Sequence, residues 1–279
     1  MELLKGIDVA NAINEQLVAQ LAERKDKIPQ LAIIRVGERP DDLSYERGAT
    51  KKMEKIGFGC TSYVFDAEID NETFQKEFDA INDNPQVDGI LLLRPLPKHL
   101  DEEAVVNRIH PEKDLDGISP VNLAKVFAGD DTGFAPCTAE AVIEMLDYAG
   151  IDLTGKKVTV VGRSLVIGKP VAMLLMKKNA TVTICHTKTK DMAAECRKAE
   201  VLVAAAGSAK MITADYVGKD AVVIDVGINV DESGKLCGDA DTEAIAVNAS
   251  LATPVPGGVG SVTTSVLAKH LMKAVQLQA

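Results

Sequence analysis

A turn between a buried strand and a helix is the clearest chemical feature of this 279-residue sequence. The apolar run 157–161 predicts the strand, Gly162-Arg163-Ser164-Leu-Val-Ile-Gly168 forms the turn, and residues 168–178 predict the helix. Such a turn can hold a phosphate, because the first N–H groups of a helix have no partner inside the helix. Ser164 replaces the middle glycine of the usual dinucleotide fingerprint, so the strand–turn–helix context carries the interpretation. We predict that Gly162, Arg163, Ser164 and Gly168 bind a nucleotide.

The next predicted strand is 181–185. In dinucleotide-binding folds, the residues after this strand distinguish NAD from NADP. NAD-selective folds usually place Asp or Glu about 20 residues beyond the glycine turn, where it binds the ribose. Here the sequence is His186-Thr187-Lys188, without an acid. Arg163 and Thr187 offer donors suited to a 2′-phosphate. The sequence therefore favours NADP and leaves NAD open.

Two later predicted strands, 201–205 and 221–226, also end in small residues. Ala206 and Gly207 follow the first strand, and Gly227-Ile228 follows the second. Small residues let the backbone approach a ligand at the carboxyl edge of a parallel sheet, although any α/β domain can contain one such turn. We assign Ala206, Gly207 and Ile228 to the same cofactor site.

Composition narrows the class of protein. The net charge is −10 and the pI is about 5.0, which argues against a nucleic-acid binder and against binding to anionic lipid. No apolar run has the length of a membrane span, and the first residues do not resemble a secretion signal. The five cysteines are scattered and the four histidines lack ligand spacing, so we predict no metal site and a cytoplasmic location with reduced thiols.

Short apolar runs alternate with amphipathic stretches, which is typical of α/β units around parallel sheets. Further strands are expected at 31–36, 61–65 and 87–93. Further helices are expected at 8–27, 41–57, 71–84, 139–149, 189–199, 213–217 and 261–276. The stretch 111–136 is rich in turn residues and is expected to be irregular. We place a domain boundary at the helix that begins near residue 139.

Six sequence blocks resemble the methylenetetrahydrofolate dehydrogenase/cyclohydrolase family. They span nearly the whole chain in the family's order and are Ser44-Tyr45, Pro111-Glu-Lys-Asp-Leu-Asp-Gly117, Phe134-Ala-Pro-Cys-Thr138, Gly162-Arg-Ser…Gly168-Lys-Pro170, Val223-Ile-Asp-Val-Gly-Ile-Asn229 and Thr253-Pro-Val-Pro-Gly-Gly-Val-Gly260. The resemblance implies a folate-binding catalytic domain at 1–138 and a Rossmann-like, doubly wound NAD(P) domain at 139–261. It also implies that 262–279 packs back onto the first domain and that the protein is a homodimer.

The implied reaction is oxidation of 5,10-methylenetetrahydrofolate to the 5,10-methenyl compound, which most members then hydrolyse to 10-formyltetrahydrofolate. Asp116 matches the family's folate-binding aspartate, and its carboxylate can accept paired bonds from pterin N–H groups. Tyr45 matches the active-site tyrosine. The same resemblance assigns Leu93, Pro95, Pro256, Gly257 and Gly258 to the substrate. It assigns Gly260 and Thr263 to the cofactor.

Two positions depart from the family pattern. The family has a catalytic lysine one helical turn after the tyrosine, and Ala49 stands there. It has a glutamine that tunes this lysine, and Leu93 stands at that place. An apolar side chain exchanges no protons, so we expect weak or absent cyclohydrolase activity. Lys52 returns to the face of Tyr45 about 10 Å further along the helix and is the candidate replacement, with Lys51 as a second candidate.

Three alternatives remain open at this stage. The chain is a full bifunctional dehydrogenase/cyclohydrolase that uses Lys52 or Lys51, a shikimate-type or amino acid dehydrogenase, or a folate- or nucleotide-binding protein without catalysis. The second alternative needs a lysine–aspartate proton-transfer pair, for which the sequence shows no motif.

Overall fold

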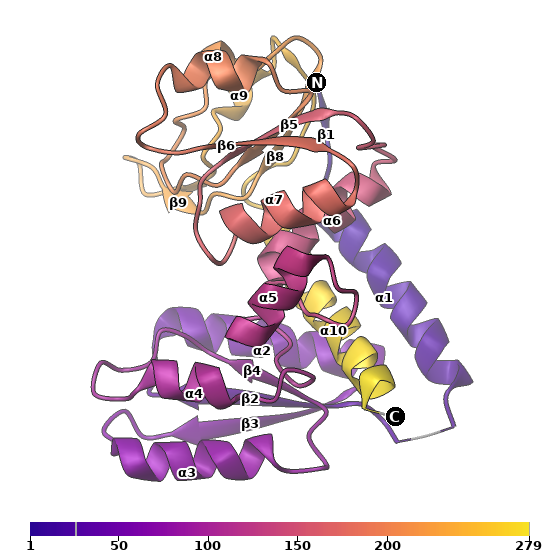
Figure 1. Cartoon of the computed structure of the whole chain (residues 1–279), viewed down its shortest axis with the longest axis vertical. Helices are drawn as coiled ribbons and strands as arrows, with labels where there is room; N and C mark the ends of the chain where they lie inside the picture. The colour runs from indigo at the N-terminus through magenta and orange to yellow at the C-terminus, as the bar shows by residue number, and fades with distance from the viewer. Residues whose placement is uncertain (26, 279) are drawn as a thin grey trace. The chain divides into compact units, whose positions relative to one another are not determined.

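The computed structural model describes residues 1–25 and 27–278, which form two compact units. Unit 1 comprises Met1–Asn11 and Thr138–Thr263, and unit 2 comprises Ala12–Cys137 and Thr264–Ala279. Residue 26, within the helix predicted at 8–27, and residue 279, within the predicted returning segment, lie outside the described residues. Across the described chain, no helix has the length and apolar character needed to cross a membrane. Both units are α/β, as predicted (Figure 1).

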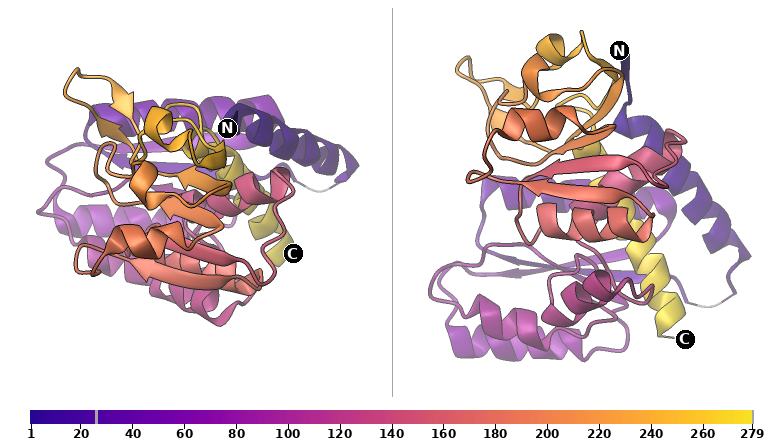
Figure 2. Two further views of the ribbon diagram at one scale, coloured as in Figure 1. Left: turned by 90° about the horizontal axis from the view of Figure 1, so that it is seen from above. Right: turned by 45° about the horizontal axis from the view of Figure 1, so that its top comes forward.

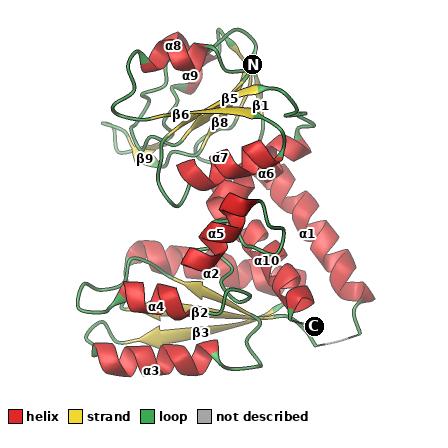
Figure 3. Ribbon diagram, viewed as in Figure 1, coloured by secondary structure: helices red, strands yellow, loops and turns green. Residues whose placement is uncertain are grey.

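Unit 2 is built on a three-stranded parallel sheet in the order β3-β2-β4. Its elements are α1 (Gly6–Glu23, which begins in unit 1), β2 (Gln30–Val36), α2 (Pro40–Ile56), β3 (Gly59–Phe65), α3 (Asn71–Asn82), β4 (Gly89–Leu92), α4 (Glu102–Arg108), α5 (Pro120–Ala128) and α10 (Thr263–Leu277). Helices α2 and α3 lie on opposite sides of the β2–β3 ribbon (Figure 3). This arrangement buries both faces of β2, and the strand is accordingly a nearly continuous apolar run.

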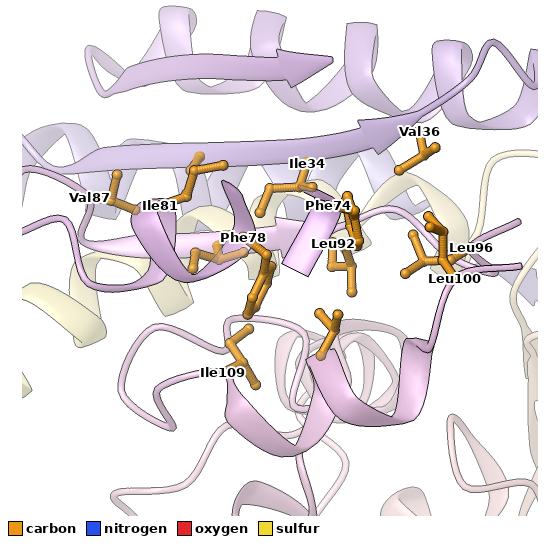
Figure 4. Packing of buried hydrophobic residues seen from close by; sticks show 13 residues of the cluster. Ile34, Val36, Phe74, Phe78, Ile81, Val87, Leu92, Leu96, Leu100 and Ile109 are labelled. Carbon is orange, nitrogen blue, oxygen red and sulfur yellow. The ribbon is translucent and has the colours of Figure 1, made fainter. Parts of the chain in front are cut away.

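One face of this sheet carries the aromatic core of unit 2. Phe74 and Phe78 of α3 are fully buried and belong to one cluster with Ile34 and Leu92 of the sheet (Figure 4). Two side chains four residues apart on a helix share a face, so both rings reach the strands. The cluster extends to Ile109, just after α4. It holds the sheet whose carboxyl end carries the predicted substrate residues.

Helix α2 covers the other face and carries Tyr45. Pro40 lies in its first turn, and its C-cap is Gly57, whose φ of 97° is left-handed. Ala49, Met53 and Ile56 form its buried stripe at intervals of three and four residues. The predicted helix at 41–57 is therefore confirmed within one residue.

The prediction that 111–136 is irregular is wrong. Helix α5 forms at Pro120–Ala128, with Ser119 as its N-cap accepting from the Asn122 N–H at 3.2 Å and Gly129 as its left-handed C-cap. The turn residues on both sides of this short helix masked it in the sequence, although Ser-Pro at its start and Gly at its end are capping signals. Helix α4 was missed for the same reason.

The predicted C-terminal helix is confirmed as α10, which groups with unit 2 from Thr264 onward. The Lys273 ammonium donates to the Gly133 carbonyl at 2.5 Å and lies 4.7 Å from the centre of the Phe134 ring. His270 packs edge-on against the same ring. These contacts tie the end of the chain to the segment that leads into α6.

Unit 1 is a Rossmann-like domain with a six-stranded parallel sheet in the order β1-β11-β8-β7-β5-β6. Its other elements are α6 (Cys137–Tyr148), β5 (Lys157–Val161), α7 (Gly168–Lys177), β6 (Thr181–Cys185), α8 (Met192–Arg197), β7 (Val201–Ala204), η1 (Ala214–Tyr216), β8 (Ala221–Asp225), β9 (Asn229–Val230), β10 (Leu236–Cys237), α9 (Thr242–Ile245), β11 (Ala249–Ala252) and η2 (Val259–Ser261). Helix α7 lies along one face of β5 and β6, and α8 lies on the other face (Figures 1 and 2). Helix α7 therefore connects β5 to β6 across one face of the sheet, and α8 connects β6 to β7 across the other face.

The first eleven residues differ from the predicted domain limits. They were expected in the first domain, but β1 (Glu2–Leu3) pairs in parallel with β11, matching Glu2 to Leu251 and Leu3 to Ala252. The Gly6 N–H then donates to the Gly257 carbonyl at 2.8 Å. A two-residue strand leaves no periodic pattern, so this edge pairing was not predicted from the sequence.

Candidate functional site

The carboxyl ends of β5 and β7 meet at the turns predicted to bind the cofactor. Gly162 has a φ of 132°, and a Cβ there would overlap the Ala205 carbonyl oxygen. The Ala205 N–H donates to the Val161 carbonyl at 2.8 Å, which fixes the two turns side by side. The chain winds in opposite directions from β5 at this point, and open α/β sheets bind ligands at such a switch.

Ser164 explains how the unusual fingerprint starts α7. Its Oγ accepts from the N–H groups of Ile167 at 3.1 Å and Gly168 at 3.4 Å, so the side chain caps the helix. A Cβ on Gly168 would overlap the Gly162 carbonyl, so the helix can approach the strand only with glycine there. Arg163 and Ser164 are both exposed at the positive end of α7. The turn thus fits an anionic group.

The predicted ribose selector lies on the neighbouring strand end. β5 and β6 are paired with Val161 opposite Cys185, so Arg163 and Thr187 follow adjacent strand ends. His186 is held within its turn: its N–H donates to the Thr189 hydroxyl at 2.9 Å, and its Nδ1 accepts from the Lys188 N–H at 3.1 Å. Thr187 and Lys188 remain exposed. The edge offers an arginine, a hydroxyl and an ammonium group, and no carboxylate stands in 186–188.

The remaining cofactor and substrate residues of unit 1 lie in three turns, which follow β7, β8 and β11. Ala206 and Gly207 are exposed after β7, and Ile228 is 71% exposed after β8. In the turn after β11 the Val255–Pro256 bond is cis, Gly257 has a φ of 97°, and a Cβ on Gly258 would overlap the Pro254 carbonyl.

Helix α10 starts soon after this turn, following η2. The Thr263 hydroxyl donates to the Gly260 carbonyl at 3.2 Å. The predicted cofactor residues and Pro256, Gly257 and Gly258 therefore all belong to unit 1.

In unit 2, helix α2 carries an apolar residue where the resemblance predicts a lysine. Tyr45 is half-buried, and Ala49, one turn later, is fully buried. Lys52 is also half-buried, and burial, with a smaller contribution from Lys55, lowers the pKa of its ammonium group. Lys51 is exposed.

The segment after β4 is fixed by hydrogen bonds that the sequence did not reveal. Leu93 is buried and its N–H donates to the Ile34 carbonyl at 2.9 Å. The Arg94–Pro95 bond is cis. Glu102 of α4 accepts from the Arg94 Nε at 2.8 Å and from the Leu96 N–H at 2.7 Å. Arg94 therefore binds Glu102 and holds this segment.

Asp116 lies in a turn that its neighbours make rigid. Its Oδ1 accepts from the Cys137 N–H at 3.0 Å. Burial raises the pKa of the Asp116 carboxyl, the Cys137 N–H opposes this, and the nearby Asp114 adds to it. Asp114 itself accepts from the Asn122 Nδ2 at 2.9 Å and the Ser119 N–H at 2.8 Å. Sequence reasoning missed Asn122, which only the fold of α5 brings to this turn.

Cys137 has a structural role beside Asp116. It is 1% exposed, and its thiol donates to the Leu115 carbonyl at 3.5 Å. The His270 Nδ1 lies 3.8 Å from the sulfur and 2.7 Å from the same carbonyl. Since a carbonyl only accepts, Nδ1 carries the proton and cannot act as the base for this thiol.

Two family models match the two parts of the chain. The tetrahydrofolate dehydrogenase/cyclohydrolase catalytic domain matches residues 4–116, and the NAD(P)-binding domain of the same family matches residues 136–279. This chain belongs to that family. The resemblance drawn from six blocks is therefore confirmed, as is a binding domain for NADP or NAD. Membership of this family also excludes the shikimate-type alternative.

Curated and solved members of the family match over nearly the whole chain. The bifunctional protein FolD of Clostridioides difficile (strain 630) is 52% identical over 279 residues, which are 99% of this chain and 97% of that one. The solved FolD dehydrogenase/cyclohydrolase of Campylobacter jejuni covers 100% of both chains at 35% identity with a TM-score of 0.95. The Trypanosoma brucei dehydrogenase-cyclohydrolase, solved with NADP and an inhibitor, has 35% identity and a TM-score of 0.91 over 99% of this chain and 97% of that one.

Proposed function

We propose that this protein oxidises 5,10-methylenetetrahydrofolate to 5,10-methenyltetrahydrofolate with NADP, and that it hydrolyses the product weakly or not at all. Membership of the family supports the dehydrogenase reaction. The carbon that loses hydride lies between two folate nitrogens, which share the positive charge that develops. No protein base is needed for this step, so orientation of the reactants carries the catalysis.

The chain's own residues are assigned roles in binding and orientation. Asp116 accepts paired bonds from the pterin N–H groups, and Tyr45 lies against the ring with Leu93 and Pro95. When bound, the nicotinamide supplies the hydride acceptor. Arg163 and Thr187 favour NADP over NAD, since they provide donors for a 2′-phosphate where NAD-selective folds usually have an acid. Pro256, Gly257 and Gly258 are assigned to the substrate.

The single observation behind the missing hydrolysis is the pair Ala49 and Leu93. Hydrolysis needs a group that exchanges protons with water and with the leaving nitrogen, and neither methyl nor isobutyl can do so. Ala49 is fully buried and Leu93 is 7% exposed, so neither position leaves an open polar site. We therefore infer a dehydrogenase whose product is released as the methenyl compound.

Lys52 favours a second candidate function, the full bifunctional enzyme. Burial lowers the pKa of its ammonium group, which brings the lysine closer to the range in which it can exchange protons. The relatives named bifunctional FolD are consistent with this candidate. Lys51 is exposed and serves as the matched comparison.

One assay of the purified chain separates these functions. Reduced nicotinamide absorbance is followed with methylenetetrahydrofolate and NADP or NAD, and decay of methenyltetrahydrofolate is followed in a weakly buffering solution. We expect dehydrogenase turnover with NADP and methenyl decay close to the uncatalysed rate. Methenyl turnover that matches the dehydrogenase, and that falls at least tenfold in Lys52→Met but not in Lys51→Met, would establish the bifunctional enzyme. No reduction of either nucleotide would leave only a binding protein.

We further propose a cytoplasmic homodimer. All five cysteines are free and four of them are buried, which suits a reducing compartment. Among the described residues, the edge strand β6 pairs with β5 alone, and its Ile184 is 36% exposed, so it offers a surface for a second copy. Light scattering of the purified protein tests the dimer.

A further inference from the structure

Two buried carboxylates, Asp225 and Asp239, lie behind the predicted cofactor turns of unit 1. Asp225 ends β8 and is 3% exposed, and Asp239 follows β10 and is 0% exposed. Neither was singled out from the sequence. Two glycines make room for them: a Cβ on Gly227 would overlap the Asp239 carboxylate, and a Cβ on Gly238 would overlap that of Asp225.

Asp239 binds the three backbone N–H groups of residues 206–208, in the turn after β7. Its Oδ2 accepts from Ala206 at 2.6 Å and Gly207 at 3.0 Å, and its Oδ1 accepts from Ser208 at 2.8 Å. The Asn229 Nδ2 adds a fourth bond to Oδ1 at 2.9 Å. Residues 206–208 are nonetheless exposed on their other side. The turn therefore directs its N–H groups inward to a carboxylate and leaves other atoms for a ligand.

Asp225 holds the segment that carries Asp239. Its Oδ1 accepts from the N–H groups of Gly227 at 2.9 Å and Asp239 at 3.0 Å, and its Oδ2 accepts from Ala240 at 2.8 Å. Its own N–H donates to the Thr253 hydroxyl at 2.8 Å. The turns after β7 and β8 are thus joined through two carboxylates. Charge-assisted bonds of this kind are short and directional, so the arrangement is stiff.

The 206–208 turn therefore has the opposite electrostatic character to the turn after β5. There, a capped helix start presents Arg163 and the positive end of α7, which suits a phosphate. At 206–208 a carboxylate occupies all three N–H groups from behind, so no backbone donor remains for a phosphate and the nearby negative charge repels one. The Ser208 carbonyl accepts from the Met211 N–H at 3.3 Å, which leaves the carbonyl oxygens of Ala206 and Gly207 to accept bonds from hydroxyl or amide N–H groups.

We propose that Asp239 is a positioning residue that makes the 206–208 turn a hydrogen-bond acceptor for the nicotinamide–ribose end of the cofactor. The inference rests on the proposed function, because it assumes that unit 1 binds NADP or NAD. It divides the site by chemistry: the turn after β5 binds the phosphate-bearing adenosine half, and the turn after β7 binds the half that accepts hydride.

The test compares a whole cofactor with its adenosine half. The Kd of NADP and of adenosine 2′,5′-bisphosphate is measured by titration calorimetry for the wild type and for Asp239→Asn, whose amide NH₂ must face backbone N–H groups. We expect the Kd of NADP to rise at least tenfold and that of the bisphosphate to change less than twofold. Asp231→Asn is the matched control. Asp231 also accepts from backbone N–H groups, at Ser233 and Lys235, but it lies in the β9–β10 hairpin, and its carboxylate pairs with the Lys210 ammonium at 3.2 Å rather than with the N–H groups of 206–208.

A milder variant guards against misfolding of Asp239→Asn. Asn229→Ala removes one of the four donors to Asp239 and should raise the Kd of NADP two- to fivefold, again without effect on the bisphosphate. Equal weakening of both ligands would show a general structural role and overturn the proposal, as would unchanged NADP binding in both variants. Failure of the wild type to bind either NADP or NAD would instead refute the proposed function.

Discussion

Asp225 makes the stability of unit 1 depend on pH in a direction unusual for an aspartate. Burial raises the pKa of its carboxyl to about 6, the N–H groups of Ala240, Asp239 and Gly227 oppose this, and the Asp239 carboxylate adds to it. The folded pKa exceeds the unfolded value of 3.8. The folded state therefore binds the proton more tightly, and this stabilising contribution is fully present below about pH 4 and is lost as the pH rises through about 6.

The size of the effect follows from the two pKa values. A difference of this size corresponds to about 3 kcal/mol of unfolding free energy between the acid and neutral limits, since each pKa unit is worth about 1.4 kcal/mol. About half of it, roughly 1.4 kcal/mol, falls between pH 5 and pH 7.5. Asp225→Asn removes the titrating group, so the wild type should lose this amount relative to the variant over that range.

Urea unfolding followed by far-ultraviolet circular dichroism measures this difference, because the chain contains no tryptophan to report by fluorescence. The wild-type value minus the Asp225→Asn value cancels all groups that titrate equally in both proteins. Asp231→Asn is the control: hydrogen bonds from Ser233 lower the pKa of its carboxyl, so its contribution is lost only in stronger acid and the difference should be flat from pH 5 to 7.5. A difference for Asp225→Asn that stays constant within about 0.3 kcal/mol, or that rises with pH, would refute the reasoning.

Three further predictions concern unit 2. Ala49→Lys combined with Leu93→Gln should raise methenyltetrahydrofolate hydrolysis at least tenfold over the wild type, because it restores a group that exchanges protons; no gain in a folded double variant would contradict the role given to these positions. Asp116→Ala should raise the KM for methylenetetrahydrofolate at least tenfold and leave the Kd of NADP within twofold; an unchanged KM would remove Asp116 from the substrate site. Phe74→Ala should lower the unfolding free energy by about 3–5 kcal/mol, since the ring is fully buried; in urea unfolding, a loss below about 1 kcal/mol would show that the core refills the space.

Much of the fold was predictable because its signals are local. The strands β2, β5, β7 and β8 are mostly apolar runs of four to seven residues, and a strand buried on both faces needs no other pattern. Helix α2 carries its own stripe and glycine stop. Short elements were missed instead: β1 has two residues, and α5 has nine and sits between turn sequences. Their stability comes from pairing and capping partners elsewhere in the chain, which a local pattern does not contain.

For the site, the sequence by itself determined the chemistry available: the Gly162–Gly168 turn, the absence of an acid at 186–188, and the replacement of two polar residues by Ala49 and Leu93. Residue type and spacing suffice for these features, because each depends on neighbouring residues in the sequence and not on distant contacts. Only the tertiary structure decided that Asp239 would bind the 206–208 turn from 31 residues away and that Asn122 would hold Asp114. The sequence does not distinguish a buried aspartate in a loop from a solvated one. Its hydrogen-bond donors come from distant parts of the chain and reach it only when the protein folds.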